Sequence, residues 1–145
     1  MCVQLYTTAK DSGKKLESCG LHSLHGLGSV SEGAVNVSVN PSVRFQKFMG
    51  IGGAFTDASA INFSRLSESK QEELLTAYFD PEKGNAYQLG RIPIHSCDFS
   101  TESYTYIDEG DAELKTFSVS VDRSHKISFI KKAIALSGRG IALIA

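Results

Sequence analysis

Apolar strand-like segments alternate with amphipathic helical segments along the second part of this chain, and this alternation constrains the fold more than any other feature. The predicted order is a strand at Phe48–Gly53, a helix from Ser69 to Phe79, a strand at Ala86–Ile94, a helix from near Asp122 to Ser137, and a strand at Ile141–Ala145. A β-α-β-α-β order is typical of parallel strands joined by helical crossovers. The sequence therefore predicts an α/β fold.

The first of these helices has clear start and stop signals. Ser69 and Glu72 have the spacing of a capping box, and an apolar stripe with helical periodicity follows at Leu74, Leu75, Tyr78 and Phe79. Asp80-Pro81 then ends the pattern. We expect the helix to begin at Ser69 and to pack its stripe against the sheet.

Residues 1–44 follow a different pattern, that of a small antiparallel β-domain. Val3, Leu5 and Thr7 alternate with other residues, as do Val35, Val37 and Val39, and each set predicts a strand. Ser18–Gly33, between them, has no periodicity and is predicted to be loop with room for one more short strand. We place the domain boundary between residues 44 and 45.

Composition and the chain ends exclude several classes of protein. The 145 residues carry a formal net charge of −1 without a block of Lys or Arg, which argues against a nucleic-acid partner. No stretch approaches the roughly 18 to 20 consecutive apolar residues needed to span a bilayer, and Met1–Tyr6 lacks the basic start and apolar core of a signal peptide, so we expect neither element within these residues. The last strand is apolar up to Ala145, with no charge or turn after it, so we expect a chain interrupted within a larger domain.

Polar residues gather where the second predicted strand ends, at His95, Cys97 and Asp98. The carboxyl ends of strands form the active-site face of (β/α)8 barrels and the ligand edge of open sheets, so this cluster indicates an enzyme under either architecture. The cluster lacks the converging ligands of a zinc site, and we predict no metal. Nor is a dinucleotide cofactor predicted, because Phe55 occupies the sixth place of the glycine-rich segment Gly50–Phe55.

Two features in and after this strand each have two interpretations. Arg91 needs a carboxylate partner from another segment if the strand is buried, and needs none if it faces solvent. Asp98-Phe99 combines a carboxylate that can accept hydrogen bonds from sugar hydroxyls with a ring that can lie against the apolar face of a sugar. A loop aspartate that stabilises a local turn is the simpler alternative.

Two long segments carry a family resemblance. Phe45–Ala58, FQKFMGIGGAFTDA, resembles the first barrel strand of glycoside hydrolase family 30. Arg91–Ser100, RIPIHSCDFS, with Ser103–Tyr106, SYTY, resembles the second strand and loop of the glucosylceramidase branch of that family. The resemblance implies the first three strands and two helices of a (β/α)8 TIM barrel in residues 45–145, preceded by strands of an accessory β-domain in residues 1–44.

The resemblance also implies the chemistry of the whole protein. Family members are retaining β-glucosidases that use two glutamates and need neither metal nor cofactor, with glucosylceramide or a related β-glucoside as substrate. It implies transient contact with membrane lipid and a lysosomal or secreted location. The Asn-Glu-Pro segment that holds the acid/base glutamate is absent from this sequence. We therefore expect no catalytic residue before Ala145 and no activity from this chain alone.

Individual residues receive roles from the same resemblance. Asp98 corresponds to the carboxylate that binds glucose hydroxyls, and Phe99 to the aromatic residue at the cleft entrance. Arg91 corresponds to an arginine beside the nucleophile, and Asp57 is expected to support the mouth of the barrel. His95 differs from the small residue of some relatives. The alternative to an enzyme is a non-catalytic carbohydrate-binding or interaction module that remains from such a barrel.

Overall fold

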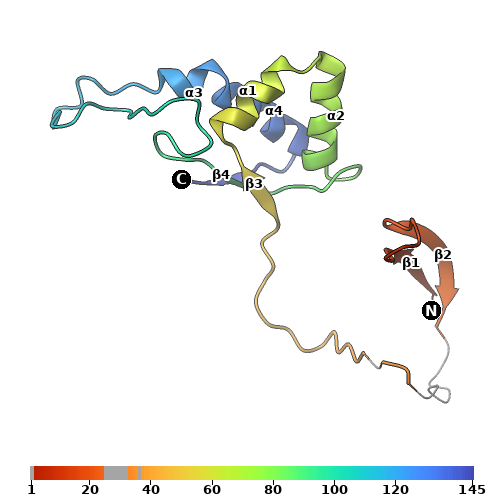
Figure 1. Ribbon diagram of the computed structural model, residues 1–145. Coiled ribbons are helices and arrows are strands. Elements are labelled where there is room, and N and C mark those ends of the chain that lie inside the picture. Colours follow the sequence, from red (N-terminus) through yellow and green to blue (C-terminus); the bar gives the residue numbers. More distant parts are fainter. Residues whose placement is uncertain (1, 25–32, 36) are drawn as a thin grey trace. The chain divides into compact units, whose positions relative to one another are not determined.

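The computed structural model describes residues 2–24, 33–35 and 37–145 (Figure 1). The chain divides into two compact units, Met1–Phe45 and Gln46–Ala145.

The first unit is built on an antiparallel strand pair. Strand β1, Cys2–Thr7, pairs with β2, Glu17–Ser23, with Val3 opposite His22. The strand predicted around Val3–Thr7 is thus confirmed. The strand predicted at Val35, Val37 and Val39 is wrong: these three side chains are 81–90% exposed and the described part of the segment is irregular, because β2 takes the place beside β1. Asn36 lies outside the described residues.

The second unit contains a three-stranded parallel sheet in the order β3-β4-β5, as the alternation predicts. The strands are Gly52–Ala54, Leu89–Arg91 and Ala142–Ile144. They are shorter than the predicted segments, although single bonds extend the pairing. The Phe55 N–H donates to the Arg91 carbonyl over 2.8 Å, and the Ile92 N–H donates to the Ile144 carbonyl over 2.7 Å.

The helices of this unit are α1 at Asp57–Arg65, α2 at Glu68–Phe79, α3 at Ser120–Ser124 and α4 at Lys126–Ser137. The helix predicted from near Asp122 is therefore two helices, which meet at His125. The predicted capping box is wrong, because α2 begins at Glu68 with Ser67 as its N-cap. A capping box occurs instead at α1, where Thr56 and Ser59 exchange side-chain and backbone hydrogen bonds. No helix in the described ranges is long and apolar enough to cross a membrane.

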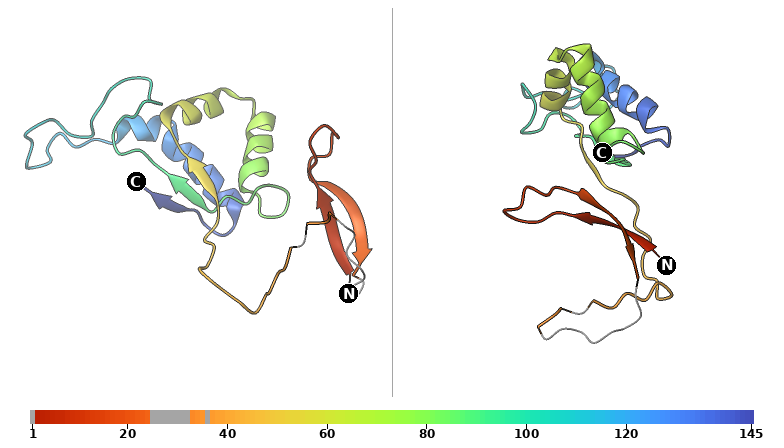
Figure 2. Two further views of the ribbon diagram at one scale, coloured as in Figure 1. Left: turned by 60° about the horizontal axis from the view of Figure 1, so that its bottom comes forward. Right: turned by 90° about the vertical axis from the view of Figure 1, so that its right-hand side faces the viewer.

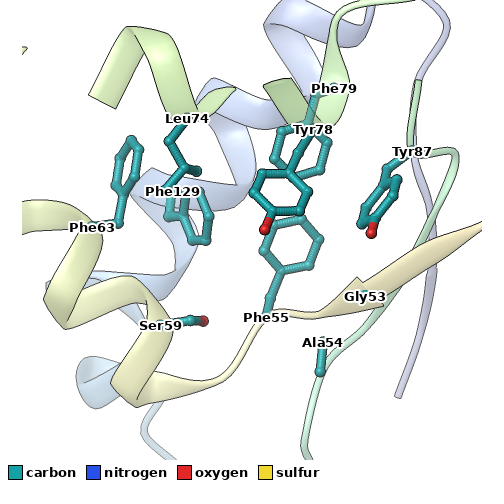
Figure 3. Close-up of a pocket in the computed structure, with 10 residues that line it drawn as sticks. All are labelled: Gly53, Ala54, Phe55, Ser59, Phe63, Leu74, Tyr78, Phe79, Tyr87 and Phe129. Carbon is teal, nitrogen blue, oxygen red and sulfur yellow. The ribbon is translucent and has the colours of Figure 1, made fainter. Parts of the chain in front are cut away.

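Aromatic rings line the space between the sheet and the helices and contact one another there (Figure 3). Phe55, which directly follows β3, stacks on Phe79 of α2 at 5.8 Å between ring centroids and meets Phe129 of α4 edge-on at 5.3 Å. Phe63 of α1 stacks on Phe129 at 4.3 Å. These rings join one strand end to three helices, so their burial fixes the position where α1 begins.

The two faces of the sheet differ. Helices α1, α2 and α4 lie on one face (Figures 1 and 2). Gly90 points toward them, because a Cβ at this residue would lie 2.6 Å from a ring carbon of Phe55. Strand alternation directs the neighbouring Arg91 to the opposite face, together with its register partners Ala54 and Ile144. All three are exposed, and no described helix covers that face.

Candidate functional site

The candidate site begins with a tight turn after β4, which carries Asp98 and Phe99 at its centre. The Ser100 N–H donates to the Cys97 carbonyl over 2.9 Å, and the Cys97 N–H donates to the Ser100 hydroxyl over 3.0 Å. The two bonds close the turn at both ends. Asp98 and Phe99 therefore occupy its two central positions, and both are exposed.

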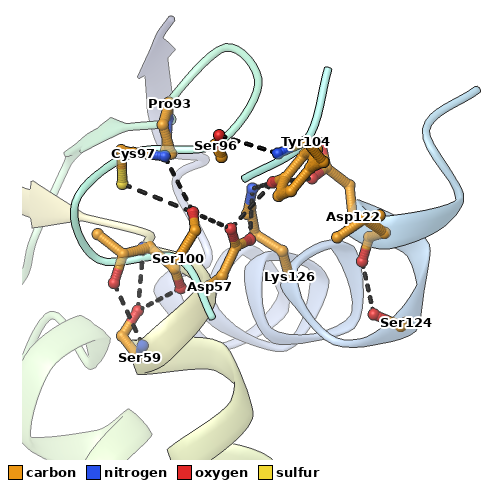
Figure 4. Close-up of polar contacts among 12 residues, drawn as sticks. Asp57, Ser59, Pro93, Ser96, Cys97, Ser100, Tyr104, Asp122, Ser124 and Lys126 are labelled. Atoms are coloured by element: carbon orange, nitrogen blue, oxygen red, sulfur yellow. Dashed lines mark hydrogen bonds and ion pairs between the residues drawn. The ribbon is translucent and has the colours of Figure 1, made fainter. Parts of the chain in front are cut away.

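This turn is attached to the first turn of α1 at two points, of which Figure 4 shows the contact between Ser100 and Asp57. The Ser100 hydroxyl donates to the Asp57 carboxylate, and the Ala58 N–H donates to the Phe99 carbonyl over 3.0 Å. The second bond satisfies one of the backbone donors that lack a partner within the helix. The turn is thus anchored to a buried helix end.

Lys126 is the centre of a buried ionic cluster behind the turn. Its side chain is 1% exposed and lies 2.7 Å from an oxygen of Asp57 and 2.8 Å from an oxygen of Asp122. The Tyr104 hydroxyl donates to Asp57 over 2.9 Å. The Tyr106 hydroxyl donates to Asp122 over 2.6 Å. We call Asp57, Tyr104, Tyr106, Asp122 and Lys126 the lysine cluster.

Asp57 and Lys126 both carry their charge at neutral pH. Burial by itself would raise the pKa of Asp57, but hydrogen bonds from Lys126, Ser100 and Tyr104 outweigh it and hold the pKa below its usual value. Burial by itself would lower the pKa of Lys126, but hydrogen bonds to Asp122 and Asp57 raise it. Burial and the bond to Asp122 raise the pKa of Tyr106 to about 12. The tyrosines therefore stay protonated and act as donors.

The loop beyond the turn is also tied down at its base. The Ser96 N–H donates to the Tyr104 carbonyl over 3.2 Å, and the Tyr104 N–H donates to the Ser96 hydroxyl over 3.1 Å. The Tyr106 N–H donates to Nδ1 of His95 over 2.8 Å, and the two rings are 4.8 Å apart. His95 has a left-handed φ of 63°. It serves as a loop anchor. The described part of the chain contains no group of three or more His, Cys, Asp or Glu side chains that could hold a metal ion.

Of the four residues singled out from the sequence, the structure buries one and exposes three. Asp57 is buried in the lysine cluster, whereas Asp98 and Arg91 are exposed and form no ion pair with any other described residue. Phe99 is 61% exposed. Asp98 and Phe99 thus have free side chains on a fixed backbone, which is an arrangement suited to binding a ligand.

One apolar cavity of this unit has a lining that shares no residue with the turn. It lies between β3 and the helices, has a volume of about 330 Å³, and is lined mainly by rings such as Phe55, Phe63 and Tyr87 (Figure 3). The lining has no carboxylate, imidazole, thiol or amine. Its only polar side-chain groups are the hydroxyls of Ser59, Tyr78 and Tyr87.

Comparison with known proteins identifies the class of protein to which this arrangement belongs. Residues 48–145 match the glycosyl hydrolase family 30 TIM-barrel domain, and the chain belongs to this family. Putative glucosylceramidase 4 of Caenorhabditis elegans is 40% identical over 143 residues, which are 97% of this chain and 26% of that protein. Lysosomal acid glucosylceramidase of Mus musculus is 42% identical over 111 residues, which are 75% of this chain and 21% of that protein.

A solved structure agrees with the fold. SrfJ from Salmonella typhimurium superimposes with a TM-score of 0.87 and 30% identity, over 99% of this chain and 31% of that one. The expected TIM-barrel class and the resemblance to glucosylceramidases are thereby confirmed. The chain spans less than a third of the length of these relatives, between 21% and 31%.

Sequence reasoning missed most of the lysine cluster. Only Asp57 was singled out, on the resemblance alone. Asp122 and Lys126 have the i,i+4 spacing of a helical ion pair, which was the available signal. That spacing is common on solvated helix faces. It does not reveal that the pair is buried or that Lys126 also contacts Asp57.

Proposed function

We propose that this chain supplies the first three strands and the sugar-binding loop of a retaining β-glucosidase acting on glucosylceramide or a related β-glucoside. The observation that carries the proposal is the family match over residues 48–145, which includes the turn bearing Asp98 and Phe99. The names of the worm and mouse relatives support glucosylceramide as the substrate. With a lipid substrate, transient contact of the whole enzyme with membrane lipid follows.

Each site residue has a role in this proposal. The Asp98 carboxylate accepts hydrogen bonds from glucose hydroxyls, and the Phe99 ring lies against the apolar face of the sugar or its aglycone. Arg91 lies on the helix-free face of the sheet, which becomes the interior of a closed barrel, and its fixed positive charge stabilises a nearby carboxylate nucleophile. Asp57 holds the mouth of the barrel through the lysine cluster.

Retaining hydrolysis needs two carboxyl groups about 5 Å apart, one as nucleophile and one as acid and base. This sequence has no Asn-Glu-Pro segment to supply the acid/base glutamate. We infer that both catalytic glutamates belong to a part of the enzyme outside these 145 residues, and that the 145-residue chain alone does not hydrolyse glucosides.

The test is a hydrolysis assay of the longest polypeptide that the gene encodes in frame with residues 1–145. We expect turnover of glucosylceramide and of an aryl β-glucoside, with retention of the anomeric configuration. Asp98→Ala should lower kcat/KM by on the order of 100-fold or more, because bonds to sugar hydroxyls strengthen in the transition state. Turnover by the 145-residue chain itself would contradict the proposal.

The second candidate is a non-catalytic carbohydrate-binding or interaction module, and the exposed side chains of Asp98 and Phe99 on a hydrogen-bonded turn are the observation that favours it. It predicts that the in-frame polypeptide binds glucosides without hydrolysing them. Saturation-transfer NMR with an aryl β-glucoside would detect such binding, and Asp98→Ala should abolish it.

A further inference from the structure

The exposed side chains of Asp98 and Phe99 have little of their own to hold them in place. Phe99 is 61% exposed, and the carboxylate of Asp98 has no hydrogen-bond partner among the described residues. Their directions therefore depend on the backbone of the Cys97–Ser100 turn. Whatever fixes that backbone also fixes the two groups.

The Ser100 side chain connects this turn to the interior of the protein. Its oxygen accepts the Cys97 N–H over 3.0 Å, and its proton goes to Asp57. One hydroxyl thus closes the turn and attaches it to a buried carboxylate. Alanine at this position would remove both bonds while leaving the backbone bond between Ala58 and Phe99.

Asp57 is a rigid anchor because the lysine cluster holds it from the other side. Lys126 lies 2.7 Å away and Tyr104 donates over 2.9 Å. Lys126 is in turn held by Asp122 at 2.8 Å, and in a buried site such bonds are stronger than in water. The connection runs from α4 through Lys126 and Asp57 to Ser100.

We propose that Ser100 is a positioning residue for sugar recognition: its hydroxyl transmits the fixed position of the lysine cluster to Asp98 and Phe99. The inference rests on the proposed function, because it assumes that these two residues bind the glucosyl unit. It adds a residue with no sugar contact of its own, two positions beyond Asp98. A misplacement of about 1 Å in a binding group can cost a factor of the order of 100 in rate.

The test uses the longest in-frame polypeptide and an aryl β-glucoside. We expect Ser100→Ala to lower kcat/KM by roughly 10- to 100-fold while Tm stays within about 3 °C. Ser100→Thr keeps the hydroxyl and should recover most of the activity. Ser103→Ala is the matched control, since Ser103 lies exposed in the same loop, and it should leave kcat/KM unchanged.

A double-mutant cycle separates positioning from a general structural role. If Ser100 acts only by positioning Asp98 and Phe99, Ser100→Ala in a background that carries both Asp98→Ala and Phe99→Ala should cost less than about threefold in kcat/KM. An equal loss in both backgrounds, or a Ser100→Ala variant as active as the control, would overturn the positioning role while the proposed function stands. If Asp98→Ala keeps full activity, or the unmodified polypeptide shows no turnover, the proposed function fails and the positioning role fails with it.

Discussion

The ammonium group of Lys126 lies between the carboxylates of Asp57 and Asp122, in a side chain that is 1% exposed. A lysine loses its hydration on burial, and the loss is offset only where charges and hydrogen bonds replace the water. In this cluster the replacement is complete, because no buried side-chain nitrogen or oxygen lacks a partner within the described residues. The cluster is therefore stable as a whole and sensitive to the loss of any one member.

Lys126→Met tests this sensitivity. The variant keeps the apolar stem but leaves Asp57 and Asp122 buried without a counter-charge, so we expect unfolding free energy to fall by about 3–5 kcal/mol. Urea unfolding followed by circular dichroism measures the change. Lys131→Met, at an exposed position of the same helix, is the matched control and should stay within about 0.5 kcal/mol. Equal effects of the two substitutions would contradict the role assigned to the cluster.

At the residue scale, sequence motifs pointed to candidate binding residues, but they did not predict which charged residues are buried. Asp98 and Phe99 were singled out through a motif, and the structure places both, exposed, in the turn after β4, while their role in sugar binding stays a prediction. Lys126 has no such signal, because a lysine in an amphipathic helix is normally solvated. Its burial depends on Asp57, 69 positions earlier in the chain, and only the packed fold brings the two together.

The Phe55 ring, which follows β3, packs closely on β4 because residue 90 of that strand is a glycine without a side chain. A Cβ at Gly90 would lie 2.6 Å from Phe55 and 2.9 Å from Leu143, whereas a Cβ at its register partner Gly53 would meet only a Tyr87 ring carbon at 3.5 Å. The sheet can therefore accept a methyl group at one position of the pair and not at the other.

Gly90→Ala should consequently destabilise the second unit by about 1–3 kcal/mol, the usual cost of overpacking a core. Gly53→Ala is the control on the neighbouring strand and should be nearly neutral. Thermal unfolding of both variants gives the comparison. Equal Tm values for the two variants would contradict the expected cost of a methyl group between β4 and Phe55.

Among the elements, long periodic segments were predictable and pairing partners were not. The apolar stripe Leu74–Phe79 located α2 correctly, but the N-cap is Ser67 and not Ser69, the residue that the capping-box spacing indicated. Val35, Val37 and Val39 alternate like a strand and yet remain exposed, since a strand also requires a neighbour. That neighbour is decided by the whole sheet, and local periodicity does not contain it.

The whole second unit assigns its two sheet faces to different tasks. One face packs on helices through aromatic rings, and the other carries Arg91 and leads to the turn with Asp98. The order of strands and helices predicted the parallel sheet, and the polar residues after the second strand predicted a site at its carboxyl end, but neither predicted that the two faces differ. The network that links α4 to the turn runs from Lys126 through Asp57 to Ser100. These residues are far apart in the sequence, so the network could be recognised only in the folded structure.

Acid stability is a property of the whole unit to which these carboxylates contribute together. The pKa of Asp57 is lowered by its bonds in the lysine cluster, and backbone N–H donors lower the pKa of Asp80 and Asp111. Such groups bind protons less readily when folded than when unfolded, so their stabilisation is present above the ordinary pKa of 3.8 and is lost as the pH falls through the lowered value.

We therefore expect the unfolding free energy to decrease steeply below about pH 4, as measured by urea unfolding at a series of pH values. Asp57→Asn should be less stable at neutral pH, because it leaves Lys126 with one carboxylate, and its stability should depend less on pH in the acid range. The sign of the difference is the informative part: a variant whose loss of stability grows as the pH falls would show that Asp57 is not held ionised by the lysine cluster.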